Sequence, residues 1–157
     1  MKKTLVAYFS ASGVTAEAAK AVAEKLGAEL YEIRPAVPYT EADLDWRDPE
    51  SRSSVEMRDP AFRPELAAKD AELAAYDTIY LGFPIWWHVA PTVINTFLEA
   101  YDFAGKTIVL FGTAGSEGFG KTVEAMKDSC PGAVIREGCV RNRNNGAEYA
   151  AWLESLS

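Results

Sequence analysis

The chain of 157 residues is long enough for one well-buried core and too short for two ordinary domains, so we expect a single domain over residues 1–157. Its composition, 48% hydrophobic and 25% charged, is typical of a globular protein. A formal charge of −7 without a basic stripe argues against a nucleic-acid partner, because the densest basic group, Arg136, Arg141 and Arg143, is interrupted by Glu137.

The sequence also argues against membrane and metal sites. No apolar run approaches the roughly 18 residues of a membrane span. Met1-Lys2-Lys3 is similar to the start of a signal peptide, but the apolar run after it is short and lacks a cleavage site, so we expect a cytoplasmic protein. One histidine, His88, excludes a histidine-cluster metal site. Cys130 and Cys139 lack CxxC spacing and are expected to be reduced and structural.

The first elements predict a strand, a tight turn, a helix and a second strand. The apolar run 5–9 is typical of a buried strand and leads into a turn over 10–15. Residues 15–26 place apolar side chains at helical spacing, and Gly27 follows as a C-cap would. Residues 28–33 then form a short strand. This order is that of the parallel, right-handed strand–helix–strand unit.

Residues 34–69 interrupt this alternation where a second crossover helix would normally lie. Five prolines punctuate the segment, and only 41–46 and 50–57 are short helical candidates. Its bulky side chains either cover the edge of a cofactor or pin the segment to the core. Those side chains are Tyr39, Trp46, Arg52 and Phe62.

Beyond residue 69 the alternation returns. We expect helices over 69–75, 92–101, 121–129 and 147–156, and strands over 77–83, 106–112 and 133–140. Five strands alternating with helices predict an α/β fold, a three-layer doubly wound parallel sheet. Ligands bind such sheets beyond the carboxyl ends of the strands.

The turn over 10–15 predicts an anion site. Gly13 allows close approach or a positive φ, and Ser10, Ser12 and Thr15 offer hydroxyl donors beside the N–H groups of a new helix. The turn holds no Lys or Arg, which suits a small phosphate monoester better than a magnesium-bound triphosphate. The alternative is that Ser12 merely caps the helix.

Two further unusual loops lie on the same predicted edge, Pro84 to His88 and the Gly-rich stretch Thr113 to Gly120. Together with the first loop they fit a flat, phosphorylated heteroaromatic ligand. Trp86 and Trp87 could instead be plain core residues. His88 either hydrogen-bonds the ligand ring or acts near a proton-coupled step, or else it faces solvent or bonds to the backbone.

These residues resemble the flavodoxin-like FMN proteins, in a short-chain subgroup. The S-x-S-G-x-T of residues 10–15 is similar to their phosphate loop, and the G-F-P-I-W-W-H-V-A-P of residues 82–91 is similar to a ring-binding loop, also seen in NAD(P)H quinone reductases. The resemblance implies a flavodoxin-like sheet of order 2-1-3-4-5 with bound FMN. It implies that the phosphate is surrounded by Ser10, Ala11, Ser12, Gly13, Val14 and Thr15. It implies that the ring is lined by Pro84, Ile85, Trp86, Trp87 and His88, and on its other edge by Thr113, Ala114, Gly115, Ser116 and Gly118.

The resemblance leaves three functions open. The chain is an electron carrier docking on protein partners, an enzyme passing hydride from NAD(P)H to a quinone or other small acceptor, or a flavin-free interaction module. In each flavin-bound case the cofactor carries the redox chemistry, so no side chain need be catalytic. The third loop lacks the Tyr and Asp of electron-transfer flavodoxins, and no Gly lies between Phe83 and Ala90, which argues against a stable one-electron intermediate. The acidic charge suits basic redox partners or simply solubility.

A rival motif overlaps the third loop. Residues 115–122 match the nucleotide-binding pattern G-x-x-x-x-G-K-T. The preceding strand over 77–83, however, ends in Gly-Phe-Pro rather than a magnesium-holding Asp, and little chain follows the motif. Both features disfavour NTP hydrolysis.

Overall fold

The computed structural model describes residues 3–156, so Met1 and Lys2, on which the signal-peptide comparison rests, lie outside it. Its sheet has five parallel strands in the order β2-β1-β3-β4-β5, which confirms the predicted doubly wound α/β fold. The strands are β1 (Thr4–Tyr8), β2 (Glu29–Glu32), β3 (Thr78–Pro84), β4 (Thr107–Thr113) and β5 (Val134–Arg141).

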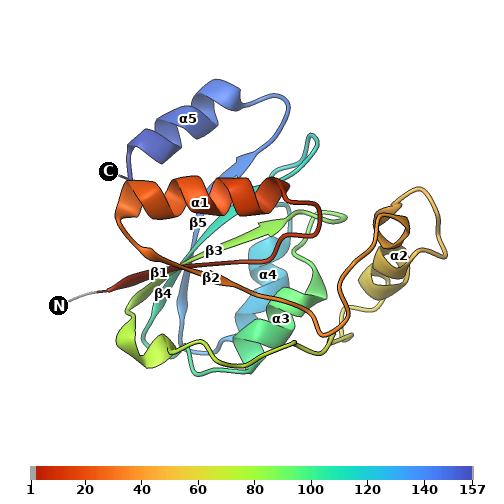
Figure 1. Ribbon diagram of the computed structural model, residues 1–157, viewed down its shortest axis with the longest axis horizontal. Helices are drawn as coiled ribbons and strands as arrows, with labels where there is room; N and C mark the ends of the chain where they lie inside the picture. The colour runs from red at the N-terminus through yellow and green to blue at the C-terminus, as the bar shows by residue number, and fades with distance from the viewer. Residues whose placement is uncertain (1–2, 157) are drawn as a thin grey trace.

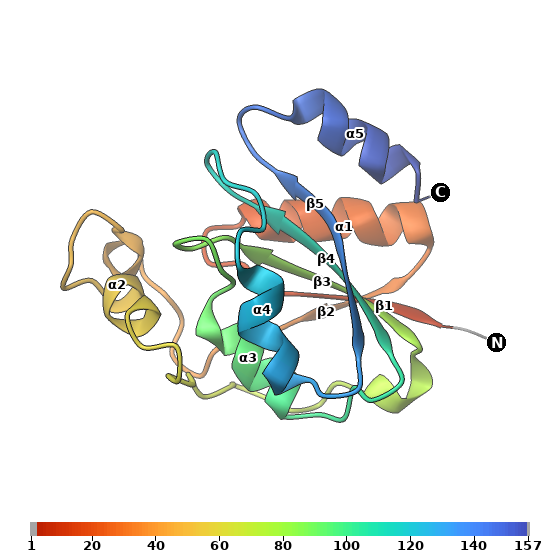
Figure 2. The same ribbon diagram turned by 180° about the vertical axis from the view of Figure 1, so that it is seen from behind.

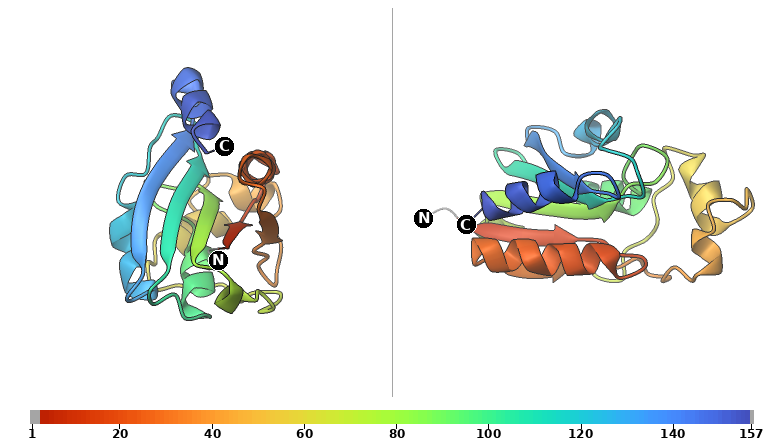
Figure 3. Two further views of the ribbon diagram at one scale, coloured as in Figure 1. Left: turned by 90° about the vertical axis from the view of Figure 1, so that its left-hand side faces the viewer. Right: turned by 90° about the horizontal axis from the view of Figure 1, so that it is seen from above.

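Helices cover both faces of the sheet (Figures 1 and 2). The helices are α1 (Val14–Leu26), α2 (Arg52–Met57), α3 (Thr92–Glu99), α4 (Thr122–Met126) and α5 (Gly146–Glu154), with 3₁₀ turns η1 (Ala42–Leu44), η2 (Leu73–Ala75) and η3 (Lys127–Ser129). Figure 3 shows α1 and α5 on one face and α3 and α4 on the other. The three layers therefore form as expected.

Two apolar clusters fill the space between the layers. On the α1 face, Val6, Val22 and Phe111 pack with the small alanines of α1. The larger cluster lies on the α3 face and includes Phe83 and Phe97. The alternation of strand side chains explains this division, because neighbouring residues of one strand face opposite layers.

Three expected helices are wrong in length. Residues 69–75 form only the turn η2, and 41–46 only the turn η1. Within η2 only Leu73 is buried, so a longer helix there would have no apolar face to pack. The helix expected over 121–129 is α4 followed by the tighter turn η3.

Residues 34–69 form an excursion that projects past the carboxyl edge of the sheet (Figures 1 and 3). Two backbone hydrogen bonds close its base, from Ala36 N–H to Glu65 O at 2.7 Å and from Ala67 N–H to Arg34 O at 2.8 Å. Its short helix α2 begins after Ser51, whose side chain accepts a hydrogen bond from Ser54 N–H. The excursion is thus an ordered loop beside the edge where ligands bind.

Among residues 3–156 no helix is long and apolar enough to cross a membrane. The same residues hold no group of three or more His, Cys, Asp or Glu side chains able to bind a metal ion. Cys130 and Cys139 are free and buried, and burial raises the pKa of both thiols. Both therefore react weakly as nucleophiles at neutral pH.

Candidate functional site

Three loops meet at the carboxyl edge: the first loop (10–15) after β1, the second loop (84–88) after β3 and the third loop (113–120) after β4. Pro84 pairs with Thr113 in the sheet, so the second and third loops begin side by side. An open hollow of about 600 Å³ lies here. It is lined by Ser12, Val14, Pro84, Ile85, Trp86, Thr113, Ala114, Arg141, Asn142, Arg143 and Gly146.

The first loop leaves the start of α1 open. Gly13 has a φ of 96°, which favours glycine, and its N–H donates a 3.0 Å hydrogen bond to Ser10 Oγ. Gly13 is also the N-cap of α1, which has no capping side chain. The interpretation of Ser12 as a helix cap is therefore wrong. Ser12 is exposed beside the uncapped N–H groups of the first helical turn, an arrangement that suits an anion.

Thr15 ties the first loop to the third. Its buried hydroxyl lies 2.8 Å from the hydroxyl of Thr113, at the end of β4. This hydrogen bond fixes the start of α1 relative to the floor of the hollow. The Thr15 hydroxyl is thus committed to an internal contact, whereas Ser12 remains exposed.

The second loop makes a tight turn with an unusual backbone. Trp86 N–H donates to Val89 O at 2.9 Å and Val89 N–H donates to Trp86 O at 3.1 Å. Between them Trp87 and His88 have φ of 48° and 70°, the left-handed values typical of Asn-Gly hairpin turns. We call residues 86–89 the aromatic turn. This strained backbone lies at the carboxyl edge of the sheet. Strained residues cluster at functional sites.

The two tryptophans of this turn are not plain core residues. Trp87 is 43% exposed, and Trp86 lines the hollow while it packs against the core. The alternative that both indoles are buried in one core is therefore wrong. His88 has a side chain that is 71% exposed, with its Nδ1 atom 3.0 Å from Glu117 Oε1, which agrees with the solvent-facing alternative.

Gly120 supports the aromatic turn from the third loop. Its φ is 56°, and a Cβ on it would lie 2.6 Å from His88 O. The next residue, Lys121, donates its N–H to the same oxygen at 2.9 Å. The hydroxyl of Thr122 donates to Phe119 O. The residues of the G-x-x-x-x-G-K-T motif therefore make internal contacts, which further disfavours nucleotide binding.

Behind the hollow, Trp86 belongs to an aromatic trio with Phe9 and Tyr39. Ring centroids lie 6.0 Å apart for Phe9 and Trp86, 5.4 Å for Tyr39 and Trp86, and 5.6 Å for Phe9 and Tyr39, all edge to face. Burial and a hydrogen bond to Glu56 raise the pKa of Tyr39, so its hydroxyl stays protonated. The bulky side chains of the excursion were expected either to cover a cofactor edge or to pin the excursion to the core. Tyr39 packs against the core and so pins it, whereas Trp46 is 69% exposed and does not.

The chain is similar to proteins of known structure and family. The Flavodoxin family model matches residues 3–156. The chain belongs to the flavodoxin family. A candidate flavoprotein from Bacteroides uniformis ATCC 8492 has a similar crystal structure, with 51% sequence identity, a TM-score of 0.88 and 98% of each chain covered. One from Bacteroides eggerthii DSM 20697 has 45% identity and a TM-score of 0.87, covering 99% of this chain and 98% of that one.

A more distant structure shares the flavodoxin fold. The crystal structure of a flavoprotein in complex with FMN from Lactobacillus acidophilus NCFM has 24% identity and a TM-score of 0.68, covering 97% of this chain and 99% of that one. No curated protein matches this flavodoxin-family chain by sequence.

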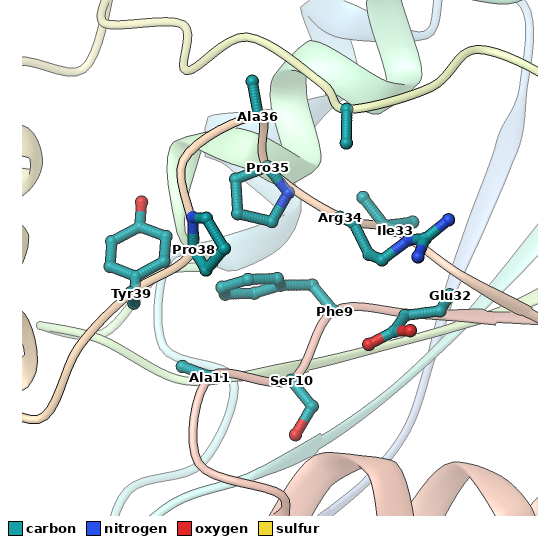
Figure 4. A pocket seen from close by; sticks show the side chains of 11 residues that line it. Phe9, Ser10, Ala11, Glu32, Ile33, Arg34, Pro35, Ala36, Pro38 and Tyr39 are labelled. Atoms are coloured by element: carbon teal, nitrogen blue, oxygen red, sulfur yellow. The ribbon is translucent and has the colours of Figure 1, made fainter.

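Some residues predicted to hold the cofactor lie outside the main hollow of this flavodoxin-family protein. Ser10 and Ala11 line a second hollow of about 310 Å³, between the first loop and the excursion (Figure 4). Other predicted residues line neither hollow: Gly13, Thr15, Trp87, His88, Gly115, Ser116 and Gly118. Gly115 instead accepts hydrogen bonds from the backbone N–H and the Nε of Arg143, both at 3.0 Å.

The loop after β5 contributes lining residues that sequence reasoning missed. Arg141, Asn142, Arg143 and Gly146 border the hollow, and Asn142 Nδ2 donates to Glu117 O at 2.9 Å. In the sequence, Arg141 and Arg143 stand out only as members of a basic group that is too interrupted for nucleic acid. Their position directly after the fifth parallel strand, at the same edge as the other loops, was the available signal.

Proposed function

We propose that this flavodoxin-family chain binds FMN in the main hollow and transfers electrons through it. The observation that carries the proposal is one hollow with Ser12 and Val14, at the uncapped start of α1, on one side and the indole of Trp86 on another. The first suits a phosphate group and the second a flat ring. Bound FMN would supply the redox chemistry, and the protein would supply binding, orientation and electrostatics.

The residues present fit this cofactor. Ser12 offers an exposed hydroxyl beside free N–H groups, so a phosphate would meet only neutral donors in the first loop. Arg141 and Arg143 add positive charge elsewhere in the hollow of a chain whose net charge is −7. The same hollow therefore favours an anionic ligand despite the acidic protein around it.

An FMN titration of the purified protein tests the proposal. We expect a yellow protein whose affinity for FMN falls more than ~100-fold in a Ser12→Asp, Val14→Asp double variant, because two carboxylates at exposed residues that line the hollow would repel the phosphate. Ala74→Asp, Ala75→Asp adds the same charge at exposed residues of η2 and should keep wild-type affinity. Full wild-type affinity in the first variant would overturn the proposal. A colourless protein that ignores FMN would favour the flavin-free module.

One observation favours a second candidate, an FMN-dependent NAD(P)H oxidoreductase. Phe119, the aromatic residue of the third loop, packs against the core and does not line the hollow. The third loop thus places no aromatic ring over the hollow, which leaves access for a second reactant. Rapid mixing of the FMN-loaded protein with NADPH separates the candidates: fast bleaching of the flavin band indicates a reductase, and none indicates a carrier.

A further inference from the structure

The wall behind Trp86 is built by the excursion. Tyr39 contacts the indole of Trp86 edge to face, with centroids 5.4 Å apart, on the side of the aromatic trio that faces the second hollow. Figure 4 shows Tyr39 beside Pro38 at the rim of that hollow, with Phe9 between them and the sheet. Tyr39 does not line the main hollow, so any effect on a ligand there must pass through Trp86.

Tyr39 is held by two side chains of α2. Its hydroxyl donates to Glu56 Oε1, and the other oxygen of Glu56 accepts a 2.8 Å hydrogen bond from Arg52 Nε. The Arg52 guanidinium also stacks over the Tyr39 ring, with Cζ 3.8 Å from the centroid. We call these three residues the Tyr39 clamp. Because Glu56 is buried and both its oxygens are bonded, the ring has little freedom to turn.

The clamp is also fastened to the backbone that carries Tyr39. Arg52 Nη1 donates to Val37 O at 2.8 Å and to Pro38 O at 3.1 Å. Two other large side chains of the excursion face solvent, since Trp46 is 69% exposed and Val37 65%, whereas Leu66, near its base, is buried in the core. The excursion therefore acts on the carboxyl edge through Tyr39 rather than through a broad apolar face.

We infer that Tyr39 is a positioning residue of the cofactor site: the Tyr39 clamp holds the indole of Trp86 in place against the flavin ring. The inference rests on the proposed FMN function. It assigns a role to the long excursion, which the sequence left between covering the cofactor and pinning to the core. The clamp pins the excursion and, through Trp86, shapes the ring side of the hollow.

Two ligands and a matched control test this inference. Riboflavin carries the ring without the phosphate, so a ring-side change should weaken FMN and riboflavin by the same factor. We expect Tyr39→Leu to weaken both about fivefold to tenfold and to alter the visible circular dichroism of the bound flavin. Tyr39→Phe keeps the ring and should retain most of the wild-type affinity for FMN and for riboflavin. Tyr76→Phe removes a similar hydrogen bond, from Tyr76 to Glu29 at the amino edge of the sheet. It should change neither the two affinities nor the circular dichroism.

The outcomes separate this inference from the proposed function. If wild-type protein binds no FMN, the proposed function fails. If it binds FMN but Tyr39→Leu matches Tyr76→Phe in affinity and dichroism, the positioning role alone fails. Loss of FMN binding with riboflavin unchanged would place the effect at the phosphate and also overturn it. Should Tyr39→Leu not fold, Tyr39→Met, which also removes the aromatic ring, is tested with the same two ligands and the same expectation.

Discussion

The first loop and the aromatic turn both contain left-handed backbone, but different types of residue adopt it. Each needs a left-handed residue at the carboxyl edge: the first loop uses Gly13, whose φ is 96°, and the aromatic turn uses Trp87 and His88, whose φ are 48° and 70°. Glycine adopts such angles freely, whereas larger residues are strained. The first loop therefore presents backbone donors without strain, and the aromatic turn accepts strain to present an indole.

The two segments are also fixed differently. A side-chain bond between Thr15 and Thr113 anchors the first loop to β4. The aromatic turn is held from outside, by Lys121 N–H on His88 O and by the close approach of Gly120. The difference teaches that one side-chain bond to β4 places the unstrained loop, while the strained turn has two backbone bonds of its own and is also held by the third loop.

Gly120→Ala should break the aromatic turn and have the largest effect. A methyl group would lie 2.6 Å from His88 O at a φ of 56°. Overpacking and left-handed strain together should lower the free energy of unfolding by about 3 kcal/mol. Urea unfolding measures this, and an FMN titration of the same protein should show weaker binding. A variant as stable as wild type would mean that the turn does not rest on Gly120.

Thr15→Val should lower the free energy of unfolding by about 2 kcal/mol, because Thr113 loses its hydroxyl partner inside the protein. Urea unfolding again provides the measurement. The double variant Thr15→Val, Thr113→Val removes both hydroxyls and should recover most of the stability. If the double variant were less stable than the single one by a similar further step, the bond would not be the anchor.

Gly13→Ala isolates the backbone cost in the first loop. A Cβ there would meet no atom within 4 Å, so only the left-handed φ of 96° opposes it. We expect a loss of about 1 to 2 kcal/mol in thermal or urea unfolding. Unchanged stability would show that the loop relaxes to a conformation open to all residues.

His88→Gly should have the smallest effect on stability and the opposite sign. Relief of strain at φ 70° exceeds the added entropy of unfolded glycine, for a net gain of about 0.5 kcal/mol. FMN affinity should not rise with stability, because a looser turn holds Trp86 less firmly. A drop in stability would mean that the His88 contact with Glu117, 3.0 Å long, outweighs the strain.

Much of this molecule was determined by the sequence alone. The apolar runs at 77–83 and 106–112 and the helical spacing of 15–26 predicted the strands and the helix found there, because buried parallel strands and amphipathic helices depend on local patterns. The alternation of strands with helices also predicted that the ligand-binding loops lie at the carboxyl edge of the sheet.

Only the tertiary structure decided what depends on contacts distant in the chain. Arg141 and Arg143 line the hollow because β5 ends beside β4, and Tyr39 meets Trp86 because the excursion folds back over the edge. The left-handed angles of Trp87 and His88 follow no local preference, since their own propensities oppose them and neighbouring segments impose them. Local propensity thus determined most helices and strands, and packing between remote segments determined the shape of the site.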